Sequence, residues 1–594
     1  MDRNTIIAVI LCVIVITIGM TYQQTLLSNE IIETETTSVV ENVPVPLLAS
    51  SSFTALGSDG DASKFSVSSG SLEITFDPKG GTVDSIYDKV NDVNLILKEE
   101  GDENAFMLYW GDDKSSPIDE IFDYSVSSKE VQGKNESITQ VSFTRSYKEE
   151  STGTEFVIEK KFAVPENDEY MIQMAVSVYT KDGSPIPINI DSEMYTLSVG
   201  SQVGPEFQSL NGNYDYRRVY YKLADKNSRK TVNSGKFTSD DSMGWAGVVG
   251  KYFAFLLIPE TQNVVNLTEA VQETGETISQ KNIIYMSRMA TGESKTTDVY
   301  SFYCGPQLSS TLGIYDNAKD NIFGLSDHNL KKALDVSWLS WLESILKVLL
   351  EVFYFLIPNY GVAIILLTIL TKVILIPLSK KGSESTAKMS ALQPKIQEIQ
   401  AKYKDDPEAQ NTAMAKLYKE EGINPMGSCW PMLIQFPIFI GLYGLLNKDF
   451  SLRGAMFIPG WIPDLSIPET IFTLPFNIPF IGSAIHLLPI IYTASMIFSM
   501  KITQSATSGQ SANKGMTWFM TYGMSIIFFF ILYNAPSGLL LYWTMSNFLS
   551  ILQQVYTNKK TVAGFKKEIE EKDAIKAQKK AAAKKRNKKV DEIM

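Results

Sequence analysis

The chain has 594 residues, a formal net charge of −12, three cysteines and two histidines. So few histidines leave little material for a multi-histidine metal site or a Ser-His-Asp triad, and the widely spaced Cys12, Cys304 and Cys429 suggest neither a disulfide framework nor a metal centre. Long uncharged apolar runs near the start and throughout the second half exclude an ordinary soluble protein and indicate a polytopic membrane protein.

The first apolar run, Thr5 to Met20, follows a short start that contains Arg3. No small-x-small cleavage site follows its core, so residues 1–22 are predicted to form an uncleaved signal-anchor helix with a cytoplasmic N-terminus. Residues 23–64 are rich in Ser, Thr and Glu and are predicted to be a flexible linker.

Short alternating runs of apolar and polar residues, separated by turn residues, fill residues 65–325. The segments Leu72 to Phe76 and Glu155 to Ala163 show this alternation most clearly. A period of two with frequent Gly, Asp and Asn turns is typical of antiparallel β-sheets. The sequence therefore predicts a large, soluble β-sandwich domain outside the membrane.

One stretch of this region, Trp245 to Tyr252, comes near a phosphate-binding loop in its spacing. However, Trp245 stands where the first glycine is needed, and Tyr252 stands where a hydroxyl residue would bind the metal ion. We therefore expect a strand and a turn here rather than a nucleotide site.

An amphipathic helix is predicted for Ser337 to Leu356, within a segment covering residues 335–360. Its apolar residues recur at helical spacing, and charged residues interrupt them. Tryptophans favour the depth of lipid headgroups, so this helix is expected to lie in the outer membrane interface. The apolar positions are Trp338, Trp341, Ile345, Val348 and Val352.

The segment Gly361 to Leu378 is apolar except for a single lysine, Lys372. As a helix it reaches about 27 Å, which is close to the hydrocarbon thickness of a bilayer. An ammonium group at that depth costs a few kcal/mol unless it meets water, a polar partner or the interface. Thr368 lies four residues earlier, so this span has a polar face. The alternative is that Lys372 extends along its own stem to the nearby cytoplasmic interface.

A helical hairpin on the cytoplasmic side is predicted for residues 384–422. In its second arm, Asp406 is expected to cap the helix and Pro407 to begin it. The hairpin either makes a working contact with incoming chains or merely packs on the membrane surface. The apolar positions of its first arm, at spacings of three and four, are Met389, Leu392, Ile396 and Ile399.

Four further spans and a basic tail follow the hairpin. The outer loop after the first of them, Asn447 to Ser483, is apolar and proline-rich and is expected to lie against the outer membrane surface. The tail, residues 558–594, carries many lysines and is predicted to be cytoplasmic. It either contacts ribosomal RNA or serves only for retention and contact with anionic lipids. The predicted spans are Met426 to Leu446, Ile485 to Met500, Met516 to Tyr533 and Ser537 to Tyr556.

Lys372 is the only ionisable residue well inside an apolar run, which argues against a proton-coupled transporter. An ion channel remains an alternative, although a single cation with no repeated polar stripe makes a poor pore. A cleft closed at its outer end fits better. Each polar residue that could line it could instead make an ordinary hydrogen bond between helices. These residues are Gln435, Thr493, Thr517, Thr521, Trp543, Thr544, Ser546 and Asn547.

Four blocks of sequence, in this order, resemble the YidC/Oxa family of membrane protein insertases. They are KVILIPL from Lys372, KMSALQPKI from Lys388, NPMGSCWPMLIQFPIF from Asn424 and PSGLLLYWTMSN from Pro536. The large β domain after a first anchor is similar to the Gram-negative form of YidC, with a periplasmic domain. The resemblance implies a polytopic α-helical protein of the bacterial inner membrane with six transmembrane helices. It also implies a five-helix insertase core at residues 361–557 and cytoplasmic termini.

By this resemblance, the groove positions of the family fall on Thr368, Lys372 and Trp543, with Tyr542 beside them. Lys372 stands where the family has arginine, so the positive charge is kept but the planar bidentate fork is lost.

The implied function is to insert and help fold nascent membrane proteins through a hydrated, positively charged groove. The groove would open to cytoplasm and lipid and would work alone or with the Sec translocase. Neither enzymatic activity nor a cofactor is expected. The positive charge of the tail and of the cytoplasmic loops suits contact with the phosphates of ribosomal RNA. A membrane-tethered sugar enzyme is the rival for the β domain, but the lack of histidine between residues 65 and 303 argues against mutarotase-like acid–base chemistry.

Overall fold

The structure is a computed structural model that describes residues 52–591, except for 58–59, 99–101, 113, 132–135, 200–201, 205–216, 233–234, 239–242, 261–264, 275–279, 335–338, 405, 423–429, 479–480 and 508–517. The predicted N-terminal anchor and most of the linker lie outside the described residues. The described residues fall into two compact units, one up to residue 335 and one from residue 336.

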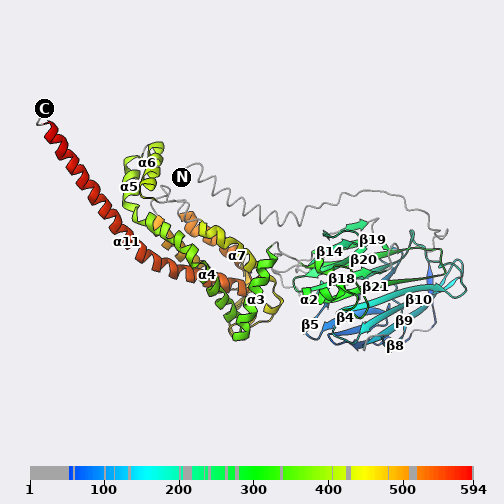
Figure 1. Cartoon of the computed structure of the whole chain (residues 1–594). Helices are drawn as coiled ribbons and strands as arrows, with labels where there is room; N and C mark the ends of the chain where they lie inside the picture. The colour runs from blue at the N-terminus through cyan, green and yellow to red at the C-terminus, as the bar shows by residue number, and fades with distance from the viewer. Residues whose placement is uncertain are drawn as a thin grey trace. The chain divides into compact units, whose positions relative to one another are not determined.

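The first unit is built mainly of antiparallel strands (Figure 1). Its largest sheet has the order β1-β9-β10-β11-β21-β18-β17-β14-β15, with β8 also pairing with β9, and a second sheet has the order β16-β19-β20-β12-β7. Two smaller sheets have the orders β2-β3-β4-β5 and β13-β6. The strands are β1 Phe53–Leu56, β2 Phe65–Ser68, β3 Leu72–Asp77, β4 Thr82–Asp88, β5 Val93–Asn94, β6 Ile96–Leu97, β7 Leu108–Trp110, β8 Asp123–Glu130, β9 Ser137–Glu149, β10 Glu155–Pro165, β11 Met171–Thr180, β12 Glu193–Val199, β13 Gln202–Val203, β14 Arg217–Leu223, β15 Arg229–Val232, β16 Gly235–Thr238, β17 Met243–Gly250, β18 Phe253–Pro259, β19 Val265–Thr274, β20 Gln280–Met289 and β21 Lys295–Pro306.

The local predictions for this unit are confirmed. β3 and β10 cover the two alternating segments, and β17 followed by a turn occupies the stretch that resembled a phosphate loop. Short helical turns close the unit: α2 Ser309–Gly313, η1 Ile314–Asp316 and η2 Leu330–Ala333.

A buried polar network joins the two large sheets. Tyr195 on β12 donates its hydroxyl to Asp298 Oδ2 on β21 at 2.7 Å, and Arg288 on β20 donates Nε to the same oxygen at 2.9 Å. A charge buried without partners would be costly, so the paired arginine and the tyrosine hydroxyl together make this carboxylate tolerable in the core. The network therefore fixes how one sheet lies on the other.

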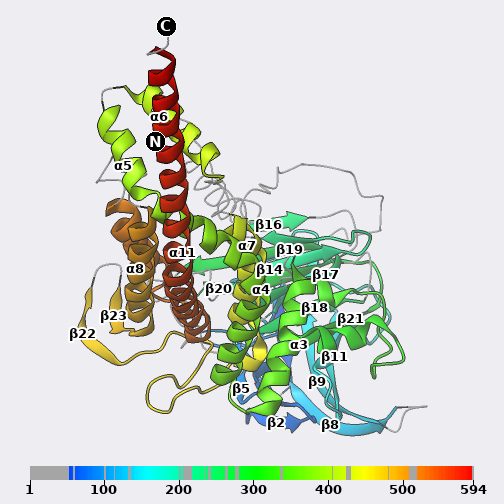
Figure 2. The same cartoon turned by 60° about the vertical axis from the view of Figure 1, so that its left-hand side comes forward.

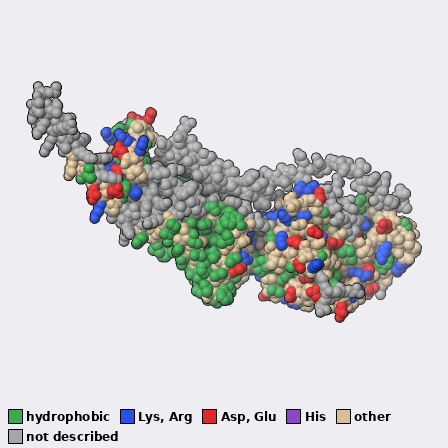
Figure 3. Space-filling model, viewed as in Figure 1, with side chains coloured by type: hydrophobic (Ala, Val, Ile, Leu, Met, Phe, Trp, Pro, Cys, Tyr) green, Lys and Arg blue, Asp and Glu red, His purple; other side chains and the backbone are tan. Residues whose placement is uncertain are grey.

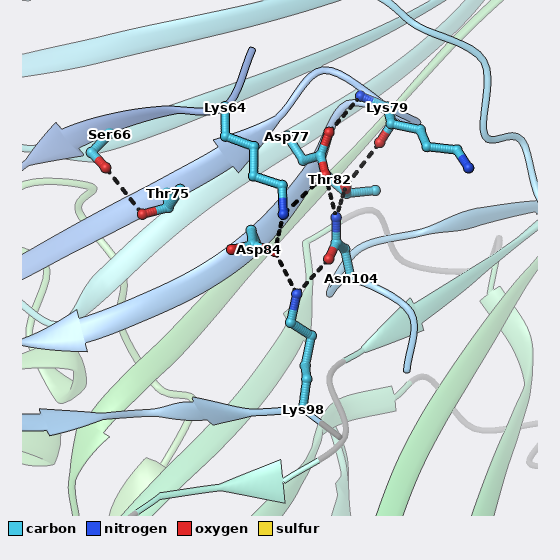
Figure 4. Close-up of polar contacts among 9 residues, drawn as sticks. All are labelled: Lys64, Ser66, Thr75, Asp77, Lys79, Thr82, Asp84, Lys98 and Asn104. Atoms are coloured by element: carbon cyan, nitrogen blue, oxygen red, sulfur yellow. Dashed lines mark hydrogen bonds and ion pairs between the residues drawn. The ribbon is translucent and has the colours of Figure 1, made fainter. Parts of the chain in front are cut away.

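A second polar cluster fastens the small sheet to the loop that follows it (Figure 4). Lys64 and Lys98 both donate to Asp84 Oδ1 on β4, at 2.8 and 2.5 Å. Asn104 accepts from Lys98 at 2.6 Å and donates to Asp77 Oδ2 at 3.0 Å. Each charge in the cluster thus has a partner within the same unit.

The second unit is mainly helical. A two-stranded hairpin, β22 Phe472–Ile478 and β23 Gly482–Ile485, lies at the end of the segment predicted to be an outer loop, Asn447 to Ser483, and extends two residues beyond it. The helices are α3 Ser340–Leu356, α4 Tyr360–Ala391, α5 Gln393–Lys402, α6 Pro407–Glu420, α7 Trp430–Lys448, η4 Phe450–Leu452, α8 Leu488–Thr507, the π-helical turn η5 Phe519–Gly523, α10 Met524–Leu532 and α11 Ser537–Asp591.

Among the described residues, one helix is long and apolar enough to cross a membrane: Tyr360–Pro377 of α4, with a mean hydropathy of 2.2 over 18 residues. Leu488–Ile502 and Thr521–Leu532 are shorter apolar helices. The six-span arrangement therefore stays a prediction.

Hydrophobic side chains gather on the face of the helical unit where α3 lies (Figure 3). Four of the five apolar positions predicted for this helix are exposed and the fifth, Trp338, lies outside the described residues, whereas Leu346 and Leu350 on the other side of the helix are buried. The exposed members are Trp341, Ile345, Val348 and Val352.

Two boundaries differ from the sequence prediction. The first arm of the hairpin is not separate from the preceding span, because α4 continues to Ala391 and the break falls at Leu392, just before Pro394. A proline is favourable in the first turn of a helix, where its missing N–H is not needed, so Pro394 suits a helix that begins at Gln393. The predicted last span and the start of the tail form one continuous helix, α11.

Candidate functional site

The polar face predicted for the first core span is present on α4. Thr368 is fully buried and donates its hydroxyl to the carbonyl of Ile364 at 2.7 Å, one turn earlier. Thr371 is also buried and donates to the Thr368 carbonyl at 2.9 Å. These threonines satisfy their hydroxyls within the helix, while Val373 on the opposite side is 54% exposed. α4 thus has one face against the helical unit and one apolar face turned outwards.

Lys372 lies between these two faces and is half-buried. Its ammonium donates to Ser550 Oγ on α11 at 2.8 Å, and Ser550 donates in turn to the Ser546 carbonyl at 2.9 Å. The partner is a neutral hydroxyl, which leaves the positive charge of the lysine uncompensated by this contact. An unneutralised ammonium at this depth needs water or an acidic ligand.

Trp543 on α11 lies in an aromatic group at the meeting of three helices. Its ring stacks on Phe439 of α7 with a centroid distance of 5.2 Å and lies 6.0 Å from Tyr492 of α8. The side chain is buried, yet its indole Nε1 has no hydrogen-bond partner among the described residues. The hydroxyl of Thr544, the next residue, is likewise buried and unpartnered there. Buried polar atoms of this kind usually meet water or a ligand.

The other predicted groove residues take several positions. Tyr542 and Ser546 are buried, and Asn547 donates to Ser495 of α8 at 3.5 Å, which is at the long limit for a hydrogen bond. Gln435 lies in α7, but its side chain is outside the described residues, and Thr517 lies outside them altogether.

Sequence reasoning missed Ser550, although a signal was available. Trp543, Ser546, Asn547 and Ser550 follow one another at spacings of three, one and three, so they share one face of a helix. The aromatic partners Phe439 and Tyr492 carried no such signal, because an aromatic residue in an apolar span looks like ordinary lipid-facing or core sequence.

The helical hairpin of α5 and α6 is closed by its own contacts. Asp406 caps α6 by accepting from the Ala409 N–H at 3.0 Å, as predicted, and Lys395 donates to Glu421 at 3.1 Å across the two arms. Of the predicted apolar positions, Leu392 and Ile396 are buried and Ile399 is half-buried, while the side chain of Met389 is outside the described residues.

Comparisons with known proteins identify the family. The model of the 60Kd inner membrane protein matches residues 352–564, and that of the YidC periplasmic domain matches residues 64–349. The membrane protein insertase YidC of Treponema denticola is 37% identical over 474 residues, which cover 79% of this chain and 80% of that protein. The chain belongs to the YidC family of membrane protein insertases.

Two further similarities accompany this assignment. The YidC of Treponema pallidum is 32% identical over 527 residues, covering 82% of this chain and 83% of that protein. A solved YidC structure, described as an active insertase with its first transmembrane domain resolved, is 19% identical with a TM-score of 0.33 and covers 86% of this chain and 95% of that chain.

Membership in the YidC family confirms the resemblance predicted from the sequence. YidC proteins are non-enzymatic insertases of the bacterial inner membrane with a periplasmic domain, which corresponds here to the β-rich unit. The tethered sugar enzyme considered as a rival is therefore not retained. The matched insertase region, in turn, contains the described span of α4 and the aromatic group around Trp543.

Proposed function

We propose that this chain inserts nascent membrane proteins through a hydrated, positively charged groove between α4 and α11 that opens to cytoplasm and lipid. The observation that carries the proposal is the contact of Lys372 with Ser550, because it holds a cation beside a neutral partner within an apolar span. A polar flank of a client must cross a medium where each unpaired polar group costs several kcal/mol. A hydrated groove shortens the distance over which the polar flank must cross hydrocarbon without water.

The aromatic group around Trp543 supports a second role for the same groove. Phe439 and Tyr492, which are both half-buried and pack against the buried Trp543, offer apolar contact area to a hydrophobic client segment. The unpartnered Nε1 of Trp543 and hydroxyl of Thr544 are suited to bind water or a client backbone carbonyl. Lys372 would attract acidic residues of the client flank, and partitioning of the apolar segment into lipid would supply the driving force.

The proposed membrane arrangement has six spans with both termini in the cytoplasm. In this arrangement α3 lies in the outer interface with its exposed stripe in lipid, and the β-rich unit lies in the periplasm. The β22–β23 hairpin belongs to the outer loop, and its exposed Phe472 and Phe476 would rest in the headgroup region. The cytoplasmic hairpin and the basic tail would meet the ribosome, and the chain would act alone or beside the Sec translocase, without a cofactor.

Site-specific crosslinking tests the groove. A photo-crosslinking residue at Thr368, Lys372 or Trp543 is expected to capture a stalled nascent membrane protein on its ribosome. The matched control is Val373, which is on the outward face of α4 and should meet lipid. Capture from Val373 but from none of the three groove positions would refute the proposal.

A further inference from the structure

The apolar face of the cytoplasmic hairpin is covered by the chain's own C-terminal helix. Phe565 and Ile569 of α11 are buried in one cluster with Ala391, Leu392 and Ile396, which lie at the α4–α5 junction and in α5. Figure 2 shows α11 passing beside α5 and α6. Side chains of α6 pack at the edge of the cluster: Met414, Leu417 and Tyr418.

The contact has the form of a helix laid on an apolar surface. Phe565 and Ile569 are four residues apart and so point to the same side of α11. The Lys388 ammonium lies 5.2 Å from the centroid of the Phe565 ring, which adds a cation–π contact. In contrast, Ile575 further along the same helix is 52% exposed. The tail therefore meets the hairpin through one short apolar patch, which we call the tail contact.

The hairpin also has contacts of its own that do not depend on the tail. The Lys395–Glu421 ion pair joins its two arms, and the Asp406 cap begins its second arm. Neither involves α11. Removal of the tail would thus uncover the apolar cluster and leave these contacts within the hairpin in place.

We infer that the tail contact is a displaceable cover, and that the apolar helical segment of an entering client replaces Phe565 and Ile569 on the hairpin. This inference rests on the proposed function. The tether to the last span keeps the tail at high local concentration, so the surface is covered when no client is present. A client segment that is to enter the membrane presents more apolar area than two side chains, so it competes for the same surface.

The same helix links this exchange to the groove. α11 carries the groove residues Trp543 and Ser550 in its first part and the tail contact farther on, without a break in the helix. Release of Phe565 and Ile569 frees the cytoplasmic part of a helix whose membrane part contacts Lys372. Binding of a client to the hairpin is thereby coupled to the position of α11, the helix that lines the groove.

The first experiment tests the cover in the full chain without a client. With the three native cysteines replaced by serine, Ile396→Cys is labelled with a maleimide in inverted membrane vesicles. Phe565→Ala with Ile569→Ala should speed labelling by about tenfold, since reaction of a buried thiol follows its local opening. Ile575→Ala, at an exposed position of the same helix, should leave the rate unchanged. Equal rates in all three proteins would overturn the inference.

The second experiment tests displacement. A photo-crosslinking residue at position 565 should react with the hairpin in the idle protein. It should lose at least half of that product when a ribosome presents a stalled chain with an apolar segment, but not when serines replace the leucines of that segment. An unchanged hairpin product, while the client is captured from Thr368, would overturn the inference. Failure to capture the client from Thr368 would count against the proposed function alone. In that case the rate of maleimide labelling at Ile396→Cys still tests whether the tail covers the hairpin.

Discussion

Two lysines of this chain lie in apolar surroundings, and their amines have different kinds of hydrogen-bond partner. Lys372 has a hydroxyl partner between helices, whereas Lys160 is completely buried in the β-rich unit and donates to the carbonyls of Gly80 and Phe106 at 2.9 and 2.6 Å. Backbone carbonyls satisfy the hydrogen-bonding needs of an amine without neutralising a charge. Burial therefore lowers the pKa of Lys160 to about 7, so its amine is largely neutral above that pH.

Replacement of Lys372 tests whether its charge or its bulk matters. Lys372→Leu should lower insertion of a client with an acidic flank by about tenfold, which corresponds to a loss of ~1.4 kcal/mol of attraction. Lys372→Arg keeps the charge and should retain insertion. Protease protection of the translocated flank measures both. Undiminished insertion by the leucine variant would contradict a role for the positive charge.

The pKa of Lys160 predicts a pH-dependent stability with a definite sign. Between pH 7 and about 9.5 the unfolded chain holds the lysine proton and the folded chain does not, so stability should rise with pH by at most ~1.4 kcal/mol per unit. Lys160→Met should abolish this slope. Denaturant unfolding of the β-rich unit in the intact protein, followed by tryptophan fluorescence, measures it. Lys161→Met, at a half-exposed neighbouring position, should keep the slope, and a flat wild-type profile would show that Lys160 is charged in the fold.

At the level of elements, the β22–β23 hairpin needs an explanation because a lone two-stranded ribbon is only marginally stable in water. Its base is fastened to the helical unit: Glu469 accepts from the Leu488 N–H, and the Tyr533 hydroxyl donates to the Ala484 carbonyl at 2.9 Å. Its exposed surface is apolar, with Phe472 and Phe476 each more than half exposed. A lipid interface would cover what the protein leaves open.

We therefore expect the ribbon to sit in the headgroup region. The full-length Phe476→Trp variant is reconstituted in liposomes, and the fluorescence of the wild-type protein is subtracted from that of the variant. The remaining fluorescence, which comes from the new tryptophan, should be quenched more strongly by lipids brominated near the headgroup than by lipids brominated at the end of the acyl chain. The control is Phe53→Trp in the β-rich unit, which should add fluorescence that neither lipid quenches. Quenching of Phe476→Trp no stronger than that control would place the ribbon in water.

The cap of α6 gives a prediction for the hairpin of α5 and α6. Asp406→Ala removes the acceptor for the Ala409 N–H and should destabilise the helix by about 1 kcal/mol. Hydrogen exchange of the first turn of α6 should become roughly fivefold faster. Lys416→Ala, at an exposed position in the same helix, is the control and should change exchange little. Equal exchange in both variants would mean that the cap contributes nothing.

For the whole molecule, the features that follow local rules could be predicted and those that depend on distant contacts could not. Alternation predicted β10 almost to its ends, and the Asp-Pro pair predicted the start of α6. The hydrogen bond between Tyr195 and Asp298 joins residues that are 103 positions apart, so no local sequence pattern predicts it. The tail contact was missed because Phe565 and Ile569 are isolated apolar residues in a charged stretch.

The candidate site shows the same division. Lys372 stood out because an ammonium in an apolar run is costly, and the resemblance to the insertase family added Thr368 and Trp543. Its partner Ser550 is 178 residues away in sequence, and the identity of a partner across a helix interface depends on how the two helices are packed. The roles of these residues remain proposals for the crosslinking experiment.

The division of the chain into two units predicts that the β-rich unit is not needed for insertion itself. Deletion of residues 65–320 should leave insertion of a Sec-independent client within about twofold of wild type, because the proposed groove residues all lie in the helical unit. Protease protection of the client, normalised to the amount of membrane-embedded protein, measures the effect. Loss of insertion by a stably expressed deletion would show that the β-rich unit takes part.

The length of α11 has a mechanical consequence. A helix of 55 residues measures about 80 Å, and roughly 30 Å of that is enough to cross the hydrocarbon layer. The remaining part of α11 is about 50 Å long, so a tilt of only ~10° where the helix leaves the bilayer displaces its basic C-terminal end by ~9 Å. Small angular adjustments around Trp543 are thus magnified into displacements as wide as a helix at the C-terminal end of α11.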